Sequence, residues 1–212
     1  MKRLLLAAAL TMAPLPAEAL VTFDWAHLPA KMDQSQIERL VREAAKEFTA
    51  PPYADAGPMD FFKDPSFTLR IRFGTLEEKS HSYVLYDPLE NTLTFNMRHV
   101  ALWGANEPLF RSAILHEFSH VYDKEKGRLP QSLTFYRLKR ENAQRTQAGL
   151  PPVPIPLSLE KAFQAERVRG ECRAYTVTLK YLDRFPETHR SEMHMWVREN
   201  RFWYCLGPII PS

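Results

Sequence analysis

Residues 116–120 read His-Glu-Phe-Ser-His, with two histidines four positions apart and a glutamate between them. On an α-helix, residues four apart project from the same face, so both imidazoles can reach one metal ion. Neutral imidazole is a good zinc ligand, and three protein ligands leave a fourth position open for water. Glu117 could then accept a proton from that water. The spacing therefore predicts a Zn²⁺ site with His116 and His120 as ligands and Glu117 as general base.

The third ligand has to come from elsewhere in the chain. The extended motif H-E-x-x-H-x-x-G-x-x-H is absent, because Asp123 and Lys126 stand where it requires Gly and His. Glu171 is favoured because Ala174, about one turn later, would let two helices approach closely. A solvated helix face would explain any nearby glutamate equally well, so two rivals stay open. The candidates for the third ligand are Glu171, Glu166 and Glu160.

The segments HEFSHVYD and ECRAYTVTLKYL, which begin at His116 and Glu171, resemble the gluzincin group of zinc metallopeptidases. In that group a downstream helical glutamate completes the metal site. The two segments are also similar to exported bacterial HExxH domains of uncertain function. The resemblance covers residues 106–182 and implies that His116, His120 and Glu171 bind zinc while Glu117 acts as base.

Other polar residues of the C-terminal half have less specific interpretations. Tyr175 is a candidate catalytic residue that would steady an oxyanion beside zinc, although a buried core tyrosine is the commoner case. Asp123 is either an acceptor for a ligand imidazole or a surface charge. His189 and His194 lie five positions apart in the last predicted helix and would not share a face. We therefore predict that both are surface or packing residues.

Helices must carry most of these residues. Apolar spacing predicts a helix over residues 34–48, with Ser35 and Glu38 as a capping box. The motif helix should begin near Asn106 as N-cap and end at Gly127. Four prolines within residues 151–156 exclude a helix there. Two further helices are expected over residues 158–182 and between residues 186 and 204.

Strands are expected before the motif helix. Residues 67–73 alternate between apolar and polar side chains, which is typical of a half-buried strand. Residues 82–86 and 92–97 follow as two strands joined by a turn, and the latter strand could bind a substrate backbone by strand addition. The predicted fold is α+β and zincin-like: a small, partly antiparallel sheet packed on the HExxH helix, with a helical C-terminal half that supplies Glu171.

Residues 1–19 are typical of a secretory signal peptide. Lys2 and Arg3 precede an apolar stretch over residues 4–12, and Ala-Glu-Ala at 17–19 fits a cleavage site. Nine apolar residues are far fewer than the ~20 that span a bilayer, and no later segment is a transmembrane candidate. We therefore expect residues 20–212 to form a single metallopeptidase domain in the bacterial periplasm or outside the cell.

Cys172 and Cys205 are the two cysteines of the chain. An oxidising compartment favours a disulfide between them. The alternatives are two reduced, buried thiols, or a thiolate metal ligand at Cys172. The thiolate is disfavoured because consecutive helix residues point about 100° apart, so Cys172 and Glu171 would not face the same ion.

The expected activity is zinc-dependent hydrolysis of peptide bonds in a peptide or protein substrate of the cell envelope. Lys and Arg number 28 against 25 Asp and Glu, and the charges are interspersed, so no nucleic-acid partner is expected. Two alternatives stay open: an envelope protein with a structural zinc and no catalysis, and a zinc hydrolase of non-peptide amide or ester bonds. The ligand motif does not name the substrate, because specificity depends on the shape of the pocket.

Overall fold

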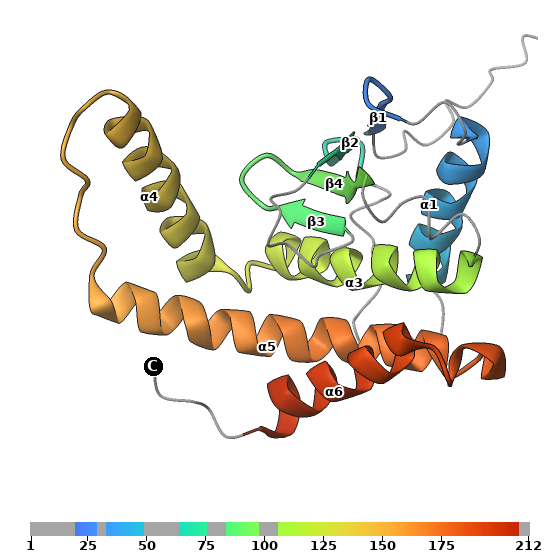
Figure 1. The fold of residues 1–212 in the computed structure, drawn as a ribbon. Helices are drawn as coiled ribbons and strands as arrows, with labels where there is room; N and C mark the ends of the chain where they lie inside the picture. Colours follow the sequence, from blue (N-terminus) through green and yellow to red (C-terminus); the bar gives the residue numbers. More distant parts are fainter. Residues whose placement is uncertain (1–19, 29–32, 49–63, 76–83, 98–105, 208–212) are drawn as a thin grey trace, which may run out of the picture.

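The computed structural model describes residues 20–28, 33–48, 64–75, 84–97 and 106–207. The predicted signal peptide, residues 1–19, lies outside the described residues. Within these ranges helices outnumber strands, and their arrangement is shown in Figure 1. The elements are β1 (Leu20–Asp24), α1 (Gln34–Phe48), β2 (Thr68–Gly74), β3 (Val84–Asp87), β4 (Thr92–Asn96), α3 (Glu107–Glu125), α4 (Pro130–Gln147), α5 (Leu157–Leu182), the 3₁₀ turn η3 (Pro186–Thr188) and α6 (Glu192–Leu206).

The strands form one mixed sheet in the order β1-β2-β4-β3. β1 pairs with β2 and β2 with β4 in parallel, whereas β3 and β4 are antiparallel. The predicted α+β class with a partly antiparallel sheet is confirmed, although β1 and the parallel pairs were not predicted. β4 lies between β2 and β3, so its hydrogen-bonding edges are both used within the sheet. The expectation that this strand adds a substrate backbone is therefore wrong.

The buried face of the sheet positions the motif helix. Leu69, Ile71 and Phe73 alternate with exposed residues along β2, as predicted. The Phe73 ring stacks on Phe95 of β4 at 5.5 Å, and Phe95 stacks on Phe110 of α3 at 5.4 Å. Stacked aromatic rings bury large apolar areas. This row of rings therefore connects the start of α3 to the sheet, which lies beside this helix (Figure 1).

The ends of α3 follow the sequence signals. The Asn106 side chain accepts a hydrogen bond from the Leu109 amide at 3.2 Å, which satisfies a free donor at the helix start. Gly127 adopts a φ of +65°, which allows the chain to leave the helix. The capping box predicted for α1 is wrong, because Asp33 accepts from the Ser35 amide at 2.9 Å in place of that arrangement.

The C-terminal half consists of helices, as predicted. The helix α4, however, was not predicted. α4 and the proline-rich connector after it form an arm that extends from the body of the molecule (Figure 1). The arm has a weak apolar pattern, because only Ser132 and Phe135 of α4 are buried among its described residues. Phe135 stacks on Phe163 of α5 at 4.1 Å, and Arg140 pairs with Asp87 of β3 at 2.8 Å. Tertiary contacts thus hold a helix that its own periodicity does not reveal.

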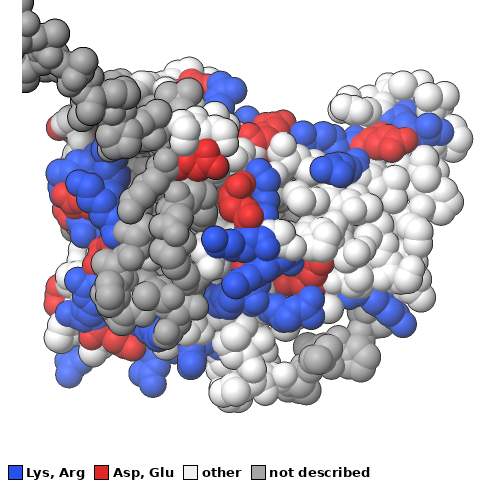
Figure 2. All heavy atoms as spheres, turned by 180° about the vertical axis from the view of Figure 1, so that it is seen from behind, with Lys and Arg blue, Asp and Glu red and all other residues white. Residues whose placement is uncertain are grey.

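Surface charge and helix composition both bear on the kinds of partner considered above. Lys and Arg side chains are mixed with Asp and Glu side chains over the face seen in Figure 2. Within the described ranges, every helix is too short or too polar to cross a membrane.

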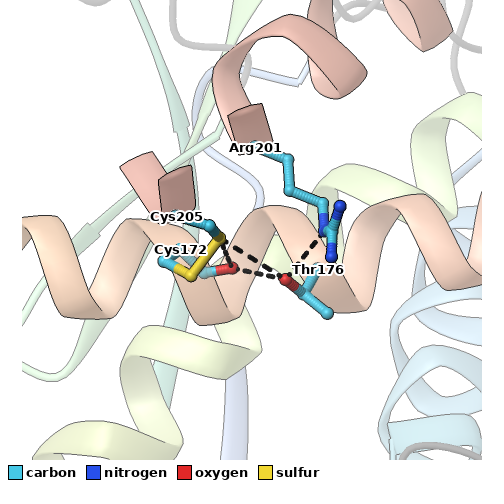
Figure 3. The surroundings of a disulfide bond; sticks show 4 residues. All are labelled: Cys172, Thr176, Arg201 and Cys205. Carbon is cyan, nitrogen blue, oxygen red and sulfur yellow. Dashed lines mark hydrogen bonds between the residues drawn. A yellow bond between two sulfur atoms is a disulfide. The ribbon is translucent and has the colours of Figure 1, made fainter. Parts of the chain in front are cut away.

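A disulfide joins Cys172 of α5 to Cys205 of α6, as predicted. Both cysteines are used, so the alternatives of reduced thiols and of a thiolate ligand are wrong. The hydroxyl of Thr176 donates to the Cys172 carbonyl at 2.7 Å and accepts from Arg201 of α6 at 3.2 Å (Figure 3). The cross-link and this bridge attach α6 to α5 directly beside Glu171.

Candidate metal centre

His116, His120 and Glu171 meet at one point between α3 and α5. The Nε2 atom of His116 lies 3.3 Å from the Oε2 atom of Glu171, and that of His120 lies 3.9 Å from the same oxygen. The two imidazole rings are 5.2 Å apart at their centroids. One possible ligand atom from each residue lies within 4.8 Å of the other two. The three residues of the predicted ligand set are therefore brought together.

The two rival glutamates lie elsewhere. Glu166 is 6% exposed, and its carboxylate accepts from the amides of Gln131 and Ser132 at 3.1 and 2.7 Å. It also accepts from the Ser132 hydroxyl at 2.8 Å. Glu166 thus satisfies free donors at the start of α4. Glu160 is exposed in the first turn of α5. Neither residue belongs to the cluster.

A close approach of the two helices makes this cluster possible. Gly170, just before Glu171, lies against α3: a Cβ atom there would be in van der Waals contact, 3.6 Å from Nδ1 of His120 and 3.7 Å from Asp123. Asp123 is 1% exposed and binds Arg173 of α5, with 2.7 Å between Oδ2 and Nη2. The reading of Asp123 as a surface charge is wrong. Its hydrogen bonds hold α5 against α3 on one side of Glu171.

Thr178 orients the first histidine from the other side. Its buried hydroxyl donates to the Ala174 carbonyl at 2.8 Å and lies 3.4 Å from Nδ1 of His116. Because the single hydroxyl proton is used on Ala174, the oxygen is left to accept from an Nδ1–H group of His116. That tautomer leaves Nε2, the atom that faces Glu171, with its lone pair available to a metal ion.

The charges of the cluster suit a cation. Burial opposes ionisation of Glu171, but the hydrogen bond from His116 and the charges of both imidazoles lower its pKa to about 2. Burial also opposes protonation of His116, yet Glu171 outweighs it and raises the pKa of that imidazole. Burial lowers the pKa of His120. The cluster thus offers an ionised carboxylate beside two imidazoles, and a metal ion would compete with protons for the imidazole nitrogens.

This donor set fits zinc. Two nitrogens and one carboxylate oxygen are common zinc ligands, and ligands about 2.0–2.1 Å from a tetrahedral ion lie about 3.3 Å from each other. The separation of His116 and Glu171 already has that size.

Glu117 lies beside the cluster and faces the sheet. Its Oε2 atom accepts a hydrogen bond from the backbone amide of Tyr86 in β3 at 2.9 Å. Burial raises the pKa of the Glu117 carboxyl to about 7. A carboxylate with a pKa near neutrality can both take and return a proton.

A cleft of about 340 Å³ opens beside these residues. β3, α3, α4, α5 and α6 all contribute to its wall, with His116, Glu117 and Glu171 among the lining residues. Tyr175 lines the cleft too, and its ring contacts the His116 ring edge-on at 4.5 Å. Burial raises the pKa of the Tyr175 hydroxyl above its usual range, so the group stays a hydrogen-bond donor. The ring of Tyr204 in α6 stacks on the Tyr175 ring at 5.6 Å.

Comparisons with models of protein families, with curated proteins and with solved structures find no match to this chain.

Several residues that hold the centre were not predicted. Arg173 and Thr178 lie two and seven positions from Glu171, so their spacing on α5 could have pointed to them once the partner helix was known. The amide of Tyr86 gives no sequence signal, because any residue except proline supplies one.

Proposed function

We propose that this chain is an exported zinc-dependent hydrolase that cleaves peptide bonds, similar to the gluzincin metallopeptidases. The observation that carries the proposal is the meeting of His116, His120 and Glu171 in the wall of a cleft, with Glu117 adjacent. His116, His120 and Glu171 would hold the ion. Four side chains from two helices would thus provide both the ligands and a base.

The chemistry divides between the ion and the protein. When bound, zinc supplies Lewis acidity, which polarises a carbonyl group and makes water more acidic. Glu117 takes a proton from the attacking water and gives it to the leaving nitrogen. The amide of Tyr86 holds one carboxylate oxygen of Glu117 in place, which leaves the other free for this transfer. Tyr175 donates a hydrogen bond to the oxygen on which negative charge develops.

A peptide is the substrate class that the cleft favours. β3 is an outer strand of the described sheet, and it borders the cleft through Val84, Leu85 and Tyr86. The Tyr86 amide points toward Glu117 and away from β4. An extended peptide that runs along β3 would therefore pass beside the base.

A structural zinc is the second candidate function. The Asp123–Arg173 ion pair joins α3 to α5 beside the cluster, and the side chains of His116 and Glu171 are largely buried. Both features are also consistent with a zinc ion that only connects the two helices. Such an ion would stabilise the helical half without turnover.

Glu117→Gln separates these functions. Glutamine keeps an oxygen that can accept from the Tyr86 amide, but it cannot accept a proton. We expect a folded, zinc-replete variant whose turnover of casein or peptidoglycan peptides falls ~100- to 10,000-fold. Glu125→Gln, near the end of the same helix, is the matched control and should keep wild-type turnover. Equal turnover by Glu117→Gln and the wild type at equal zinc content would rule out the mechanism.

A further inference from the structure

A second group of metal-ligand side chains lies at the turn between α5 and α6. Asp183 directly follows α5, His189 directly follows η3, and His194 lies in the first turn of α6. The Nε2 atom of His194 is 3.2 Å from the Oδ1 atom of Asp183, and the two imidazole rings are 4.9 Å apart. One possible ligand atom from each lies within 4.8 Å of the others. The prediction that both histidines share the last helix is wrong for His189.

The chain itself builds this turn. The Thr188 hydroxyl donates to the Phe185 carbonyl at 2.8 Å and lies 3.2 Å from the Leu182 carbonyl oxygen. The Thr188 carbonyl in turn accepts from the Ser191 amide at 2.8 Å. The Ser191 side chain caps α6 by accepting from the His194 amide at 3.1 Å. These bonds set the backbone that carries both histidines, so the cluster is preorganised.

The charges at the turn call for a cation. A carboxylate at the C-terminal end of a helix meets the negative end of the helix dipole, which is unfavourable unless a positive charge compensates. Asp183 holds that position on α5. Its neighbour Arg184 is paired with Glu47 instead. His194 is 2% exposed, and its Nδ1 atom has no hydrogen-bond partner within the described ranges.

We propose that Asp183, His189 and His194 form a second zinc site, separate from the centre between α3 and α5. Two imidazoles and one carboxylate supply three ligands, which is a donor set that zinc accepts. A hydrogen bond between His194 and Asp183 explains that pair alone. It does not explain why His189, an exposed residue, has its ring beside the buried ring of His194.

The site fastens one end of α6. The Cys172–Cys205 disulfide joins α6 to α5 near the last residues of α6, whereas the proposed ion joins it near the first. The two cross-links together hold the helix that forms part of the cleft wall. Because Asp183 and His189 are exposed, an ion held by these residues would be accessible from solvent. This inference does not depend on the hydrolase proposal.

The test is the zinc content of the purified chain after equilibrium dialysis against ZnCl₂. The wild type should bind two equivalents and His189→Ala one. His27→Ala removes another exposed histidine and should leave two. A His116→Ala/His120→Ala chain should keep one equivalent, and zinc should raise its Tm. Adding His189→Ala to that chain should abolish both the remaining equivalent and the rise in Tm.

Asp183→Asn is a second variant for the same site, because it removes the charged ligand and, unlike a histidine substitution, keeps both imidazoles. It should lower the zinc count as His189→Ala does. If both variants keep the wild-type zinc count and affinity, the second site is refuted. If the wild type binds one equivalent and the folded His116→Ala/His120→Ala chain binds none, the second site also fails while the hydrolase proposal stands. If the wild type binds one equivalent, and only the variants with His189→Ala lose it, the second site stands and the first centre does not bind zinc.

Discussion

The centre between α3 and α5 and the cluster at the α5–α6 turn contain the same donors in different surroundings. Each has two histidines and one carboxylate, and the closest nitrogen–oxygen pair is 3.3 Å apart in the first and 3.2 Å in the second. The first is carried by two packed helices and lines a cleft beside Glu117. Two of the three residues of the second are exposed at a chain reversal. The proposal of catalysis at the first centre therefore depends on Glu117 and the cleft, and not on the three donors alone.

Removal of Glu171 should break the first centre and leave the second intact. Glu171→Ala deletes the carboxylate that both imidazoles of that centre face, so we expect it to lose this zinc equivalent and all measurable turnover. Zinc content and peptide hydrolysis are measured on the same preparation. His189→Ala should also lose one equivalent, from the second cluster, but it should retain turnover.

Glu160→Ala is the matched control for this prediction, since it removes an exposed glutamate from the same helix. It should keep both zinc equivalents and full turnover. A Glu171→Ala chain that still filled the first centre would show that another residue supplies the third ligand.

The disulfide offers a test of how far the two regions depend on α6. Replacing Cys172 and Cys205 by Ala should lower the free energy of unfolding by about 3–4 kcal/mol, because the cross-link closes a long loop in the unfolded chain. Denaturant unfolding at fixed zinc measures this change. Both zinc equivalents should remain, since neither ligand set includes sulfur. An unchanged free energy of unfolding would mean that the contacts of Thr176 and Arg201 hold α6 without the cross-link.

The difference between the two clusters also explains what could be predicted from sequence. His116 and His120 are four apart on one helix, so helical periodicity alone places them together. Glu171 required the packing of a second helix, and Ala174 and the resemblance to gluzincins pointed to it among three glutamates. The cluster at the turn depends on a 3₁₀ turn and a capped helix start, and its five-residue histidine spacing carries no periodic signal. α4 has no clear periodic signal either, and its contacts with Glu166 and Phe163 join residues 35 and 28 positions apart.

The smallest expected effect concerns the orientation of a single ligand of the first centre. Thr178→Val keeps the shape of the side chain but removes the oxygen that lies 3.4 Å from Nδ1 of His116. The imidazole then loses the partner that fixes its tautomer. Loss of such a partner typically weakens metal affinity by about 10- to 100-fold. We expect that decrease at the first centre, measured by competition with a zinc chelator in a His189→Ala background.

Thr176→Val is the control that separates orientation from helix stability. Thr176 lies two residues earlier on α5, and its hydroxyl also donates to the carbonyl four residues before it, as that of Thr178 does. It contacts Arg201 and the disulfide region, and not His116. Both substitutions therefore remove one such helix bond, so an effect of helix stability alone would appear equally in both. Equal zinc affinities for the two variants would show that Thr178 supports the helix and does not orient the ligand.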